Sequence, residues 1–416
     1  MQALFLSLGF YVFCPGASAA IIDGAGNVQA GVTERDIPEL ISYFGEEGPR
    51  ANVSMELVAG FGEDAVPYLL EAAEAGTNSY QALFTISKVH SKKSVQALLK
   101  HAMDGSSPLQ GFSQVFLKGY GDFAAPEVLT ALDSWAAAKI VSEVLADAEP
   151  SKETLARVRQ LISNGKPYEK AAAASLAGAW KDEASAKGVE RLFSDEDPRV
   201  RKSAISGYRV MYENAPQKYD QAVVLAALKD PEAANRDGAL YIVRKLPTVS
   251  PEVPEVLGSM LKDEKDPVVF RNAVVTAGRV KAQALVQPLI GVLKSGADLE
   301  TKEAAVYSLG ELKASEAVPD IVEFYKTIEK PTVFVQKTFY LSLVSIGKPV
   351  DLRPFLPRLF DNTKHGSLLA LLDLIGLSAS PGDKETVSAL ERFLELHAEK
   401  DPMLAEKTTE ILKKLK

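Results

Sequence analysis

The stretch Asp197-Pro198-Arg199-Val200-Arg201-Lys202-Ser203-Ala204 is repeated in layout by Asp266-Pro267-Val268-Val269-Phe270-Arg271-Asn272-Ala273. Looser copies begin at Asp230-Pro231, Asp298, Lys330-Pro331 and Asp401-Pro402. The layout places a turn residue before a proline suited to the first position of a helix, and then a basic and a small residue. Because this helix-start signal recurs roughly every 30 to 36 residues, the sequence predicts an array of helical repeats.

Length and charge narrow the class of protein. The chain has 416 residues, more than one hydrophobic core usually holds, and it shows no break in composition that would separate ordinary domains. A solenoid, in which each repeat contacts only its neighbours, accounts for both facts. Asp and Glu number 55 against 47 Lys and Arg, for a net charge of -8. A chain of this sign repels polyanions, so nucleic acid is disfavoured as a partner.

The first residues differ from the rest of the chain. Ala3 to Phe13 is mostly apolar, no charge precedes Asp23, and Ala17-Ser18-Ala19 matches the small-x-small cleavage pattern. These features predict a secretory signal peptide over residues 1–19, cleaved near Ala19, and therefore an exported protein, periplasmic or extracellular. The apolar run is too short for a helix that spans a membrane.

The only cysteine, Cys14, falls within this predicted leader. Its neighbours Phe13 and Pro15 suit lipoprotein processing poorly, so we expect cleavage and loss of the residue rather than lipidation. The mature chain would then contain no cysteine and would be stabilised by packing alone.

Helical periodicity comes in pairs after a spacer at residues 20–32. Thr33-Glu34-Arg35-Asp36 opens a first helix, which carries Ile37, Leu40, Ile41 and Phe44 on one stripe. Shorter repeats are predicted over 33–165 and longer ones over 166–416. The predicted pairs are 50–60 with 64–75, 79–89 with 92–103, 108–118 with 124–132, 168–180 with 184–194, 198–212 with 217–229, 232–245 with 251–262, 267–279 with 282–294, 299–311 with 315–328, 332–346 with 352–360 and 364–376 with 383–397, followed by a lone helix at 402–415.

The second helix of many pairs opens with alanine-x-proline, as in Ala317-Val318-Pro319-Asp320-Ile321, and first helices carry late glycines such as Gly278 and Gly310. Together with the aspartate-proline starts, this pattern resembles the HEAT repeat family, and the shorter N-terminal repeats resemble its phycobilin-lyase-type variant. The resemblance covers about residues 33–416. It implies an all-α fold, a right-handed α-solenoid superhelix of the armadillo-like kind. We expect about eleven helix pairs with a half-pair at each end, and second helices on the concave face.

No pattern of catalytic or metal-binding residues emerges. The four histidines (His90, His101, His365, His397) have no partner at helical metal-site spacing. No nucleophile elbow, phosphate loop or dinucleotide fingerprint is present. Carboxylate pairs such as Asp195/Asp197 fall in turns, where helix capping explains them. The sequence therefore predicts no catalytic residue, no metal site, no cofactor and no enzymatic activity.

A basic series recurs near the helix starts, at Arg201, Arg236, Arg271 and Lys302. It could form an anion-binding stripe. We favour the alternative that each residue bridges an acidic residue of its own or the next turn, because residues common to all repeats usually serve the contact between repeats.

Aromatic residues are in excess over residues 315–360. Phe324 lies off the predicted core stripe of its helix and is flanked by Glu323 and Lys326, while Phe334, Phe339, Tyr340, Phe355 and Phe360 crowd the next helices. Large side chains at helical spacing usually pack inward, so we favour a thicker core for the latter group. An exposed aromatic rimmed by charge is typical of an interface anchor. Glu323, Phe324 and Lys326 are therefore the predicted partner-binding residues, and we expect Phe324→Ala to weaken binding while leaving the melting temperature nearly unchanged.

The sequence favours a non-enzymatic scaffold that binds another protein or peptide. Two alternatives stay open. The resemblance of the short repeats implies a phycobilin-lyase-like enzyme or accessory factor, against which the predicted leader argues. A nucleic-acid-binding HEAT array would need a basic groove and salt-sensitive binding. The partner's identity and the oligomeric state are not predicted.

Overall fold

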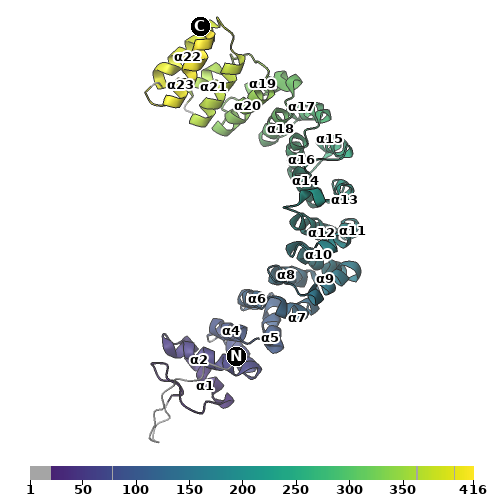
Figure 1. The fold of residues 1–416 in the computed structure, drawn as a ribbon, viewed down its shortest axis with the longest axis vertical. Helices are drawn as coiled ribbons and strands as arrows, with labels where there is room; N and C mark the ends of the chain where they lie inside the picture. Colours follow the sequence, from purple (N-terminus) through teal and green to yellow (C-terminus); the bar gives the residue numbers. More distant parts are fainter. Residues whose placement is uncertain (1–19, 77, 362–363, 398) are drawn as a thin grey trace. The chain divides into compact units, whose positions relative to one another are not determined.

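The computed structural model describes residues 20–76, 78–361, 364–397 and 399–416. The predicted leader, including Cys14, lies outside the described residues. Within them the chain forms 23 α-helices and ten short 3₁₀-helices, and its only strand-like pairing is a single bridge between Ile22 and Val28 (Figure 1). The all-α prediction is confirmed.

The helices group into two compact units, residues 1–211 and 212–416. In unit 1 the half-pair α1 is followed by five pairs and α12. The bounds are η1 (Glu34–Asp36), α1 (Ile37–Ser42), η2 (Tyr43–Gly45), α2 (Pro49–Gly60), η3 (Gly62–Ala65), α3 (Val66–Glu74), α4 (Ser79–Lys88), α5 (Lys92–Met103), α6 (Gln110–Gly119), η4 (Gly121–Ala124), α7 (Ala125–Thr130), α8 (Trp135–Leu145), α9 (Lys152–Asn164), α10 (Pro167–Ala179), η5 (Glu183–Ser185), α11 (Ala186–Arg191), η6 (Leu192–Ser194) and α12 (Pro198–Met211).

Unit 2 begins with the second helix α13, continues through five pairs and ends on a lone helix. The bounds are η7 (Pro216–Lys218), α13 (Gln221–Ala227), α14 (Ala233–Lys245), α15 (Glu252–Asp263), α16 (Pro267–Val280), η8 (Gln283–Leu285), α17 (Val286–Lys294), α18 (Leu299–Glu311), η9 (Ser315–Ala317), α19 (Val318–Lys326), α20 (Val333–Ile346), η10 (Leu356–Phe360), α21 (His365–Ser378), α22 (Lys384–His397) and α23 (Pro402–Leu415).

Helix starts follow the chemistry that the sequence indicated. The carboxylate of Asp266 accepts hydrogen bonds from the backbone N–H groups of Val268 (2.9 Å) and Val269 (3.0 Å), with Pro267 at the first helical position. Asp298 and Asp401 cap α18 and α23 in the same way. These contacts satisfy N–H groups that the first turn of a helix leaves without an intrahelical partner. The repeated start signal therefore fixes where many first helices begin.

Successive first helices pack closely because small residues line their contacts. A side-chain carbon added at Gly207 of α12 would lie 2.2 Å from the carbonyl oxygen of Ala174 in α10, and one at Gly178 would lie 2.3 Å from the carbonyl oxygen of Gly207. In unit 2, Gly278 meets Ser308 and Gly310 meets Ser342 in the same manner. Two side chains could not fit between backbones at these distances, so the glycines set the spacing of the layer.

The expectation that second helices line the concave face is wrong within each unit. First helices contact one another more extensively than second helices do, so they form the more tightly spaced, inner layer. Figure 1 shows this for unit 1, where α4, α6, α8 and α10 lie on one side of the stack and α5, α7, α9 and α11 on the other. The first-helix layer is therefore the inner surface on which a partner could be received.

Candidate partner-binding surfaces

Two members of the basic series, Arg236 and Arg271, bridge acidic residues as expected. The Arg236 guanidinium makes two hydrogen bonds of 2.7 Å with the Glu264 carboxylate, which belongs to the next turn, and donates to the carbonyl oxygens of Asp230 and Pro231 at 2.8 Å. Burial on its own raises the pKa of Glu264, but the bonds from Arg236 and from the Asp266 N–H outweigh it and hold this pKa below its ordinary value. Arg236 and Glu264 thus clamp successive repeats of unit 2.

The other members of the basic series contact different partners. Arg271 forms an ion pair with Asp298 at 3.2 Å and another with Glu300, both in the next repeat. Arg201 donates to the carbonyl oxygen of Asp195 at 2.9 Å. Lys302 has no carboxylate contact among the described residues and lies over the ring of Phe324 at 5.4 Å. These contacts favour the repeat-bridging interpretation over a continuous anion stripe.

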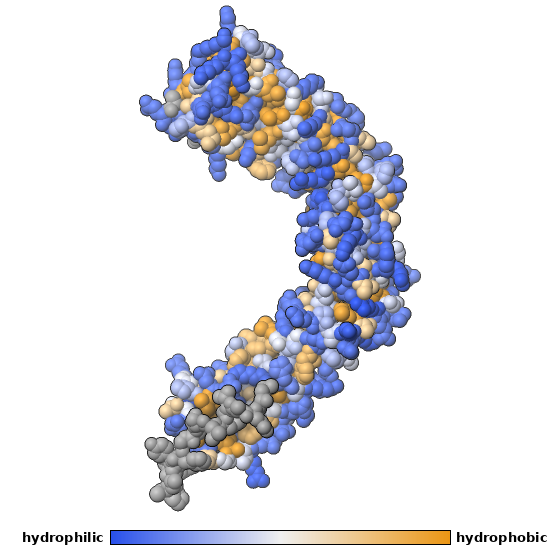
Figure 2. All heavy atoms as spheres, in the orientation of Figure 1, coloured by the Kyte–Doolittle hydropathy of each residue, from blue (hydrophilic) through white to orange (hydrophobic). Residues whose placement is uncertain are grey.

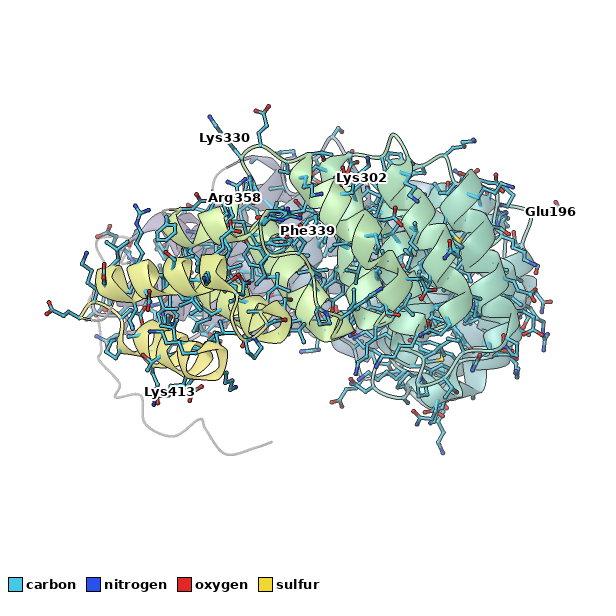
Figure 3. The ribbon with its side chains drawn as sticks, turned by 90° about the horizontal axis from the view of Figure 1, so that it is seen from above. Glu196, Lys302, Lys330, Phe339, Arg358 and Lys413 are labelled. Atoms are coloured by element: carbon cyan, nitrogen blue, oxygen red, sulfur yellow. The ribbon has the colours of Figure 1, made fainter. Side chains whose placement is uncertain are left out.

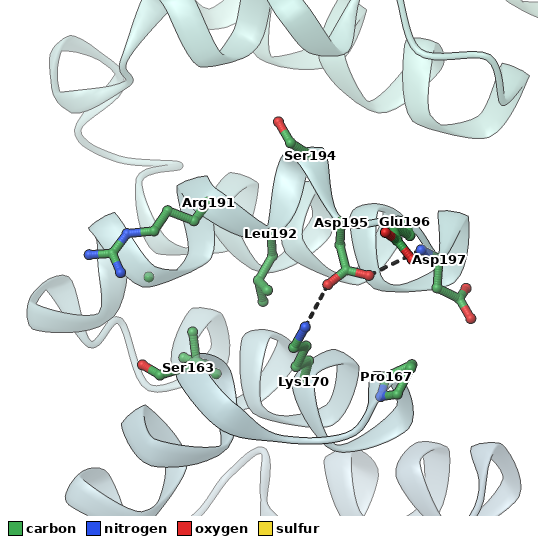
Figure 4. Close-up of a pocket in the computed structure, with 11 residues that line it drawn as sticks. Ser163, Pro167, Lys170, Arg191, Leu192, Ser194, Asp195, Glu196 and Asp197 are labelled. Atoms are coloured by element: carbon green, nitrogen blue, oxygen red, sulfur yellow. Dashed lines mark hydrogen bonds and ion pairs between the residues drawn. The ribbon is translucent and has the colours of Figure 1, made fainter.

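A pocket of about 540 Å³ opens beside α10, η6 and the start of α12 in unit 1 (Figure 4). Its charged groups are engaged with one another: the Lys170 ammonium lies 2.8 Å from the Asp195 carboxylate, which also accepts the Asp197 N–H at 3.0 Å. Asp197 is in turn paired with Arg199 at 2.8 Å, and the Arg199 bonds lower the pKa of Asp197. Asp195 therefore joins α10 to the turn before α12, and Asp197 caps and pairs within its own helix start, which supports the structural interpretation of these carboxylates.

Each histidine has a local structural role. His101 is buried and bonds Ser107 at 3.0 Å and Glu74 at 3.2 Å. His365 pairs with Asp401, His397 stacks on Phe393 with ring centroids 4.3 Å apart, and His90 lies edge-on to Tyr120. Among the described residues no group of three or more His, Cys, Asp or Glu side chains is arranged to hold a metal ion.

The structure places the three predicted binding residues on α19, where Glu323 and Lys326 are exposed and pair with each other at 3.1 Å. Phe324 is only half-exposed, because its ring packs against Phe339 at 5.5 Å between centroids and beneath the Lys302 ammonium. Figure 3 labels Lys302 and Phe339, the two residues that lie against Phe324. Phe324 is therefore partly a core residue, which corrects the expectation that its truncation leaves stability unchanged, and its role in binding stays a prediction.

The aromatic residues around α20 fall into a buried group and an exposed group. Phe339, Tyr340 and Phe355 are fully buried, and the Tyr340 and Tyr325 hydroxyls bond each other at 2.9 Å. Burial raises the pKa of Tyr340, so this phenol stays protonated. Phe334 and Phe360, by contrast, lie at the surface. The thicker-core interpretation holds for the first three residues only.

A second aromatic group, which the sequence analysis did not single out, lies on the inner layer of unit 1. We call it the aromatic face: Tyr80 and Phe84 from α4, and Phe112, Val115 and Phe116 from α6. The Tyr80 ring lies 5.4 Å from Phe112 and 5.6 Å from Phe116, and Phe84 lies 6.1 Å from Phe116. Tyr80, Phe112 and Val115 remain 49%, 47% and 63% exposed.

The aromatic face is accessible because its helices have a second apolar stripe that already packs into the core. On α4, Ala82, Leu83 and Ile86 are buried, and on α6 Leu117 is buried. Tyr80 and Phe84, spaced i and i+4, point away from that stripe, as do Phe112 and Phe116. Figure 2 shows hydrophobic residues gathered over α4 and α6. Contiguous exposed apolar surface of this kind marks an interaction site in a folded protein.

The charges of α4 and α6 offered a signal that sequence reasoning could have used. The two helices carry one lysine each, Lys88 and Lys118, and no acidic residue, although 25% of the whole chain is charged. Helices whose outer side faces only water normally carry charges there. The first helices α12, α16 and α20 also lack acidic residues, so low charge becomes a signal only together with the exposed rings that α4 and α6 carry.

Residues 301–327, within the pair α18 and α19, match the family described as PBS lyase HEAT-like repeat. These residues form a HEAT-like repeat. The matched segment contains the Ala317-Val318-Pro319 opening of a second helix, and comparable openings recur at Val66-Pro67 and Ala125-Pro126. No curated protein matches the sequence of the chain. Among the described residues, no helix is both long and apolar enough to cross a membrane.

Several solved structures resemble this chain in fold. The Escherichia coli protein YibA shares 14% identity with a TM-score of 0.49, over 65% of this chain and 97% of that chain. Kap95p, in a structure with RanGDP, shares 11% identity with a TM-score of 0.43, over 94% of this chain and 56% of that chain. An engineered protein shares 17% identity with a TM-score of 0.45, over 91% and 98% of the two chains. At these values none of the three identifies a partner or an activity here.

Proposed function

We propose that this HEAT-repeat chain is an exported, non-enzymatic scaffold that binds another protein. The observation that carries the proposal is the aromatic face of α4 and α6, an exposed apolar surface that stacking between repeats does not require. Aromatic side chains supply much of the binding energy of protein interfaces when a partner excludes water from them.

A protein partner suits the aromatic face better than a small molecule does. Small ligands bind in concave cavities that enclose most of their surface. Neither of the two described pockets, of about 540 Å³ and 440 Å³, is lined by Tyr80, Phe84, Phe112 or Phe116. The four rings form a surface that an extended partner can cover.

The non-enzymatic part of the proposal rests on how the polar groups are used. Three charged side chains at the larger pocket are used within the fold, since Lys170 pairs with Asp195 and Asp197 pairs with Arg199. An acid or base committed to an ion pair is not poised for proton transfer. The match to the PBS lyase HEAT-like repeat lies within α18 and α19, which form one helix pair of the stack. We therefore put forward the scaffold rather than a lyase.

The test is site-specific photo-cross-linking in cells that make the epitope-tagged chain. A photo-reactive phenylalanine derivative replaces Val115 on the aromatic face, and in a control it replaces Lys139 of α8, which is exposed outside that face. We expect the tagged chain in the exported fraction and a discrete cross-linked protein from position 115 only. A chain retained in the cytoplasm contradicts export. Absence of a cross-link from position 115 contradicts the scaffold.

A further inference from the structure

The partner's chemistry follows from the aromatic face, if the scaffold function just proposed is accepted. We infer that the aromatic face receives a single amphipathic helix of the partner, laid on it through an apolar side that carries no charge. The inference rests on the size of the surface, the spacing of its rings and the distribution of charge around it.

The area of the aromatic face favours a partner that docks through a single helix. A fully buried aromatic side chain covers about 150–250 Å². Tyr80 and Phe112 are about half exposed, Val115 more so, and Phe84 and Phe116 are partly buried. The aromatic face therefore presents roughly 300–400 Å². A stable dimer needs about 800 Å² from each copy. The aromatic face alone is therefore too small to hold a second copy of the chain in a stable dimer. It is large enough to be covered by one side of a single helix.

Spacing fits a helix in particular. Tyr80 and Phe84 form one row on α4, and Phe112 and Phe116 a second row on α6, each with i, i+4 spacing. Rows of this kind are the ridges that pack into the grooves of another helix, with axes about 8–10 Å apart. Gly111 and Gly119 at the ends of α6 have no neighbouring atoms within 4 Å of an added side-chain carbon, so a partner backbone has room to approach there.

The charges near the aromatic face indicate which side of the partner helix contacts it. The Lys88 ammonium is paired with Glu56 and lies 4.8 Å from the Phe84 ring centroid, and Lys139 is paired with Glu143 at 3.9 Å on the adjoining α8. These charges are matched within the chain, and a charged group pressed onto the rings would lose its water without gaining a partner. The contacting side of the helix is therefore apolar, and its affinity is insensitive to salt.

The probe is a library of fluorescent model helices with zero net charge, whose apolar residues at i, i+3, i+4 and i+7 are varied among Leu, Ile, Met, Phe and Ala. Binding to the full chain is measured by anisotropy at roughly 50 and 500 mM salt. We expect members that bind at both salt concentrations with the same affinity. Peptides of identical composition with the apolar residues scrambled around the helix are expected not to bind.

Matched variants locate the binding. Phe112→Ser and Val115→Glu are compared with Phe334→Ser and Val268→Glu, which alter side chains of comparable or greater exposure in unit 2, at 73% and 61%. The first two are expected to weaken binding at least tenfold and the last two to leave it unchanged, with all four showing wild-type circular dichroism.

Three outcomes overturn the inference. The first is equal binding by all four variants, and the second is a library without any binder. The third is a dimer in sedimentation that Phe112→Ser dissociates, since the occupant would then be a second copy. If the library fails while Val115 still cross-links an exported protein, the scaffold function stands and only the helical partner is rejected. A missing cross-link rejects the scaffold itself.

Discussion

At the scale of single residues, the Arg236–Glu264 clamp shows how a recurrent basic residue serves the fold. Both side chains are largely buried, with 17% and 4% exposed, and the guanidinium engages both carboxylate oxygens. Removing one partner of such a pair leaves a buried charge uncompensated, which costs about 3–5 kcal/mol. We expect Glu264→Gln to lower the free energy of unfolding at pH 7 by about 3 kcal/mol, measured by urea denaturation.

The same variant has a predicted pH dependence. Because the folded-state pKa of Glu264 lies below its unfolded value of about 4.3, the unfolded state binds more protons in this range, and the contribution of Glu264 is lost as pH falls through the folded-state pKa. The difference in free energy of unfolding between wild type and Glu264→Gln should therefore shrink as the pH falls below 5. Glu143→Gln is the control, because Glu143 is an exposed glutamate that pairs with Lys139 only at 3.9 Å. An equal deficit at every pH would contradict the prediction.

Phe324 carries the second residue-scale prediction. Its ring packs on Phe339 and beneath Lys302, so Phe324→Ala removes buried aromatic contact as well as an exposed edge. We expect the free energy of unfolding to fall by about 1–2 kcal/mol, less than the 3–5 kcal/mol of a fully buried phenylalanine. Thermal melting measures this effect, with Phe334→Ala as the exposed control. An unchanged melting temperature would restore the view of Phe324 as a purely surface residue.

Sequence spacing placed Phe324 off the core stripe but could not reveal what covers it. Ile321 and Tyr325 are buried, as the stripe predicted. The cover over Phe324 comes from α18, the first helix of its own pair, and from α20 of the next repeat. The periodicity within α19 contains no information about either helix. The same limit concealed the aromatic face, whose rings from α4 and α6 meet only when the helices stack.

At the scale of elements, recurring start signals predicted most helices, and their failures have physical causes. Helices α8 and α9 begin at Ser134 and Ser151 caps without the proline that marks other starts, so they were not singled out. The predicted helix 352–360 is instead only the short η10. Pro354 and Pro357 lack N–H groups for the hydrogen bonds of an α-helix, and the segment closes in 3₁₀ turns.

The glycine contact between α10 and α12 gives an element-scale prediction. Any side chain at Gly207 meets the backbone of Ala174, which cannot rotate aside as a side chain would. We expect Gly207→Ala to force these helices apart and to lower the free energy of unfolding by about 2–3 kcal/mol, in the range of overpacked cores. Gly291→Ala in α17 is the matched control. No atom lies within 4 Å of the added carbon there, so alanine should stabilise the helix by about 0.5–1 kcal/mol. Chemical denaturation distinguishes the two signs, and a neutral Gly207→Ala would show that the layer can relax.

At the scale of the whole molecule, the solenoid was predictable because each repeat carries a similar pattern of helix starts and small residues. The partner surface was not predictable, since its position depends on which repeats differ from that pattern. The departure at Lys330-Pro331 favoured unit 2, whereas the combination of aromatic residues and low charge on α4 and α6 breaks no repeat motif. Composition measured helix by helix, rather than over the chain, would have found it.

The prediction at the scale of the whole molecule concerns export and cleavage of the predicted leader. Burial in the described chain begins with Ile21 and Ile22, so cleavage after Ala19 would remove none of the described core residues. It would remove Cys14, the only cysteine. The protein recovered from the exported fraction is therefore expected to begin at Ala20 by intact mass and to react with no thiol reagent.

Stability of the mature chain then rests on packing alone, so its thermal unfolding should be identical with and without a reducing agent. A Cys14→Ser precursor, which retains an apolar leader but cannot be lipidated, is the control for processing. It should be exported and cleaved like the wild type. Recovery of wild-type protein that begins at Cys14 and carries the mass of a lipid would contradict cleavage at Ala19 and place the scaffold on a membrane surface.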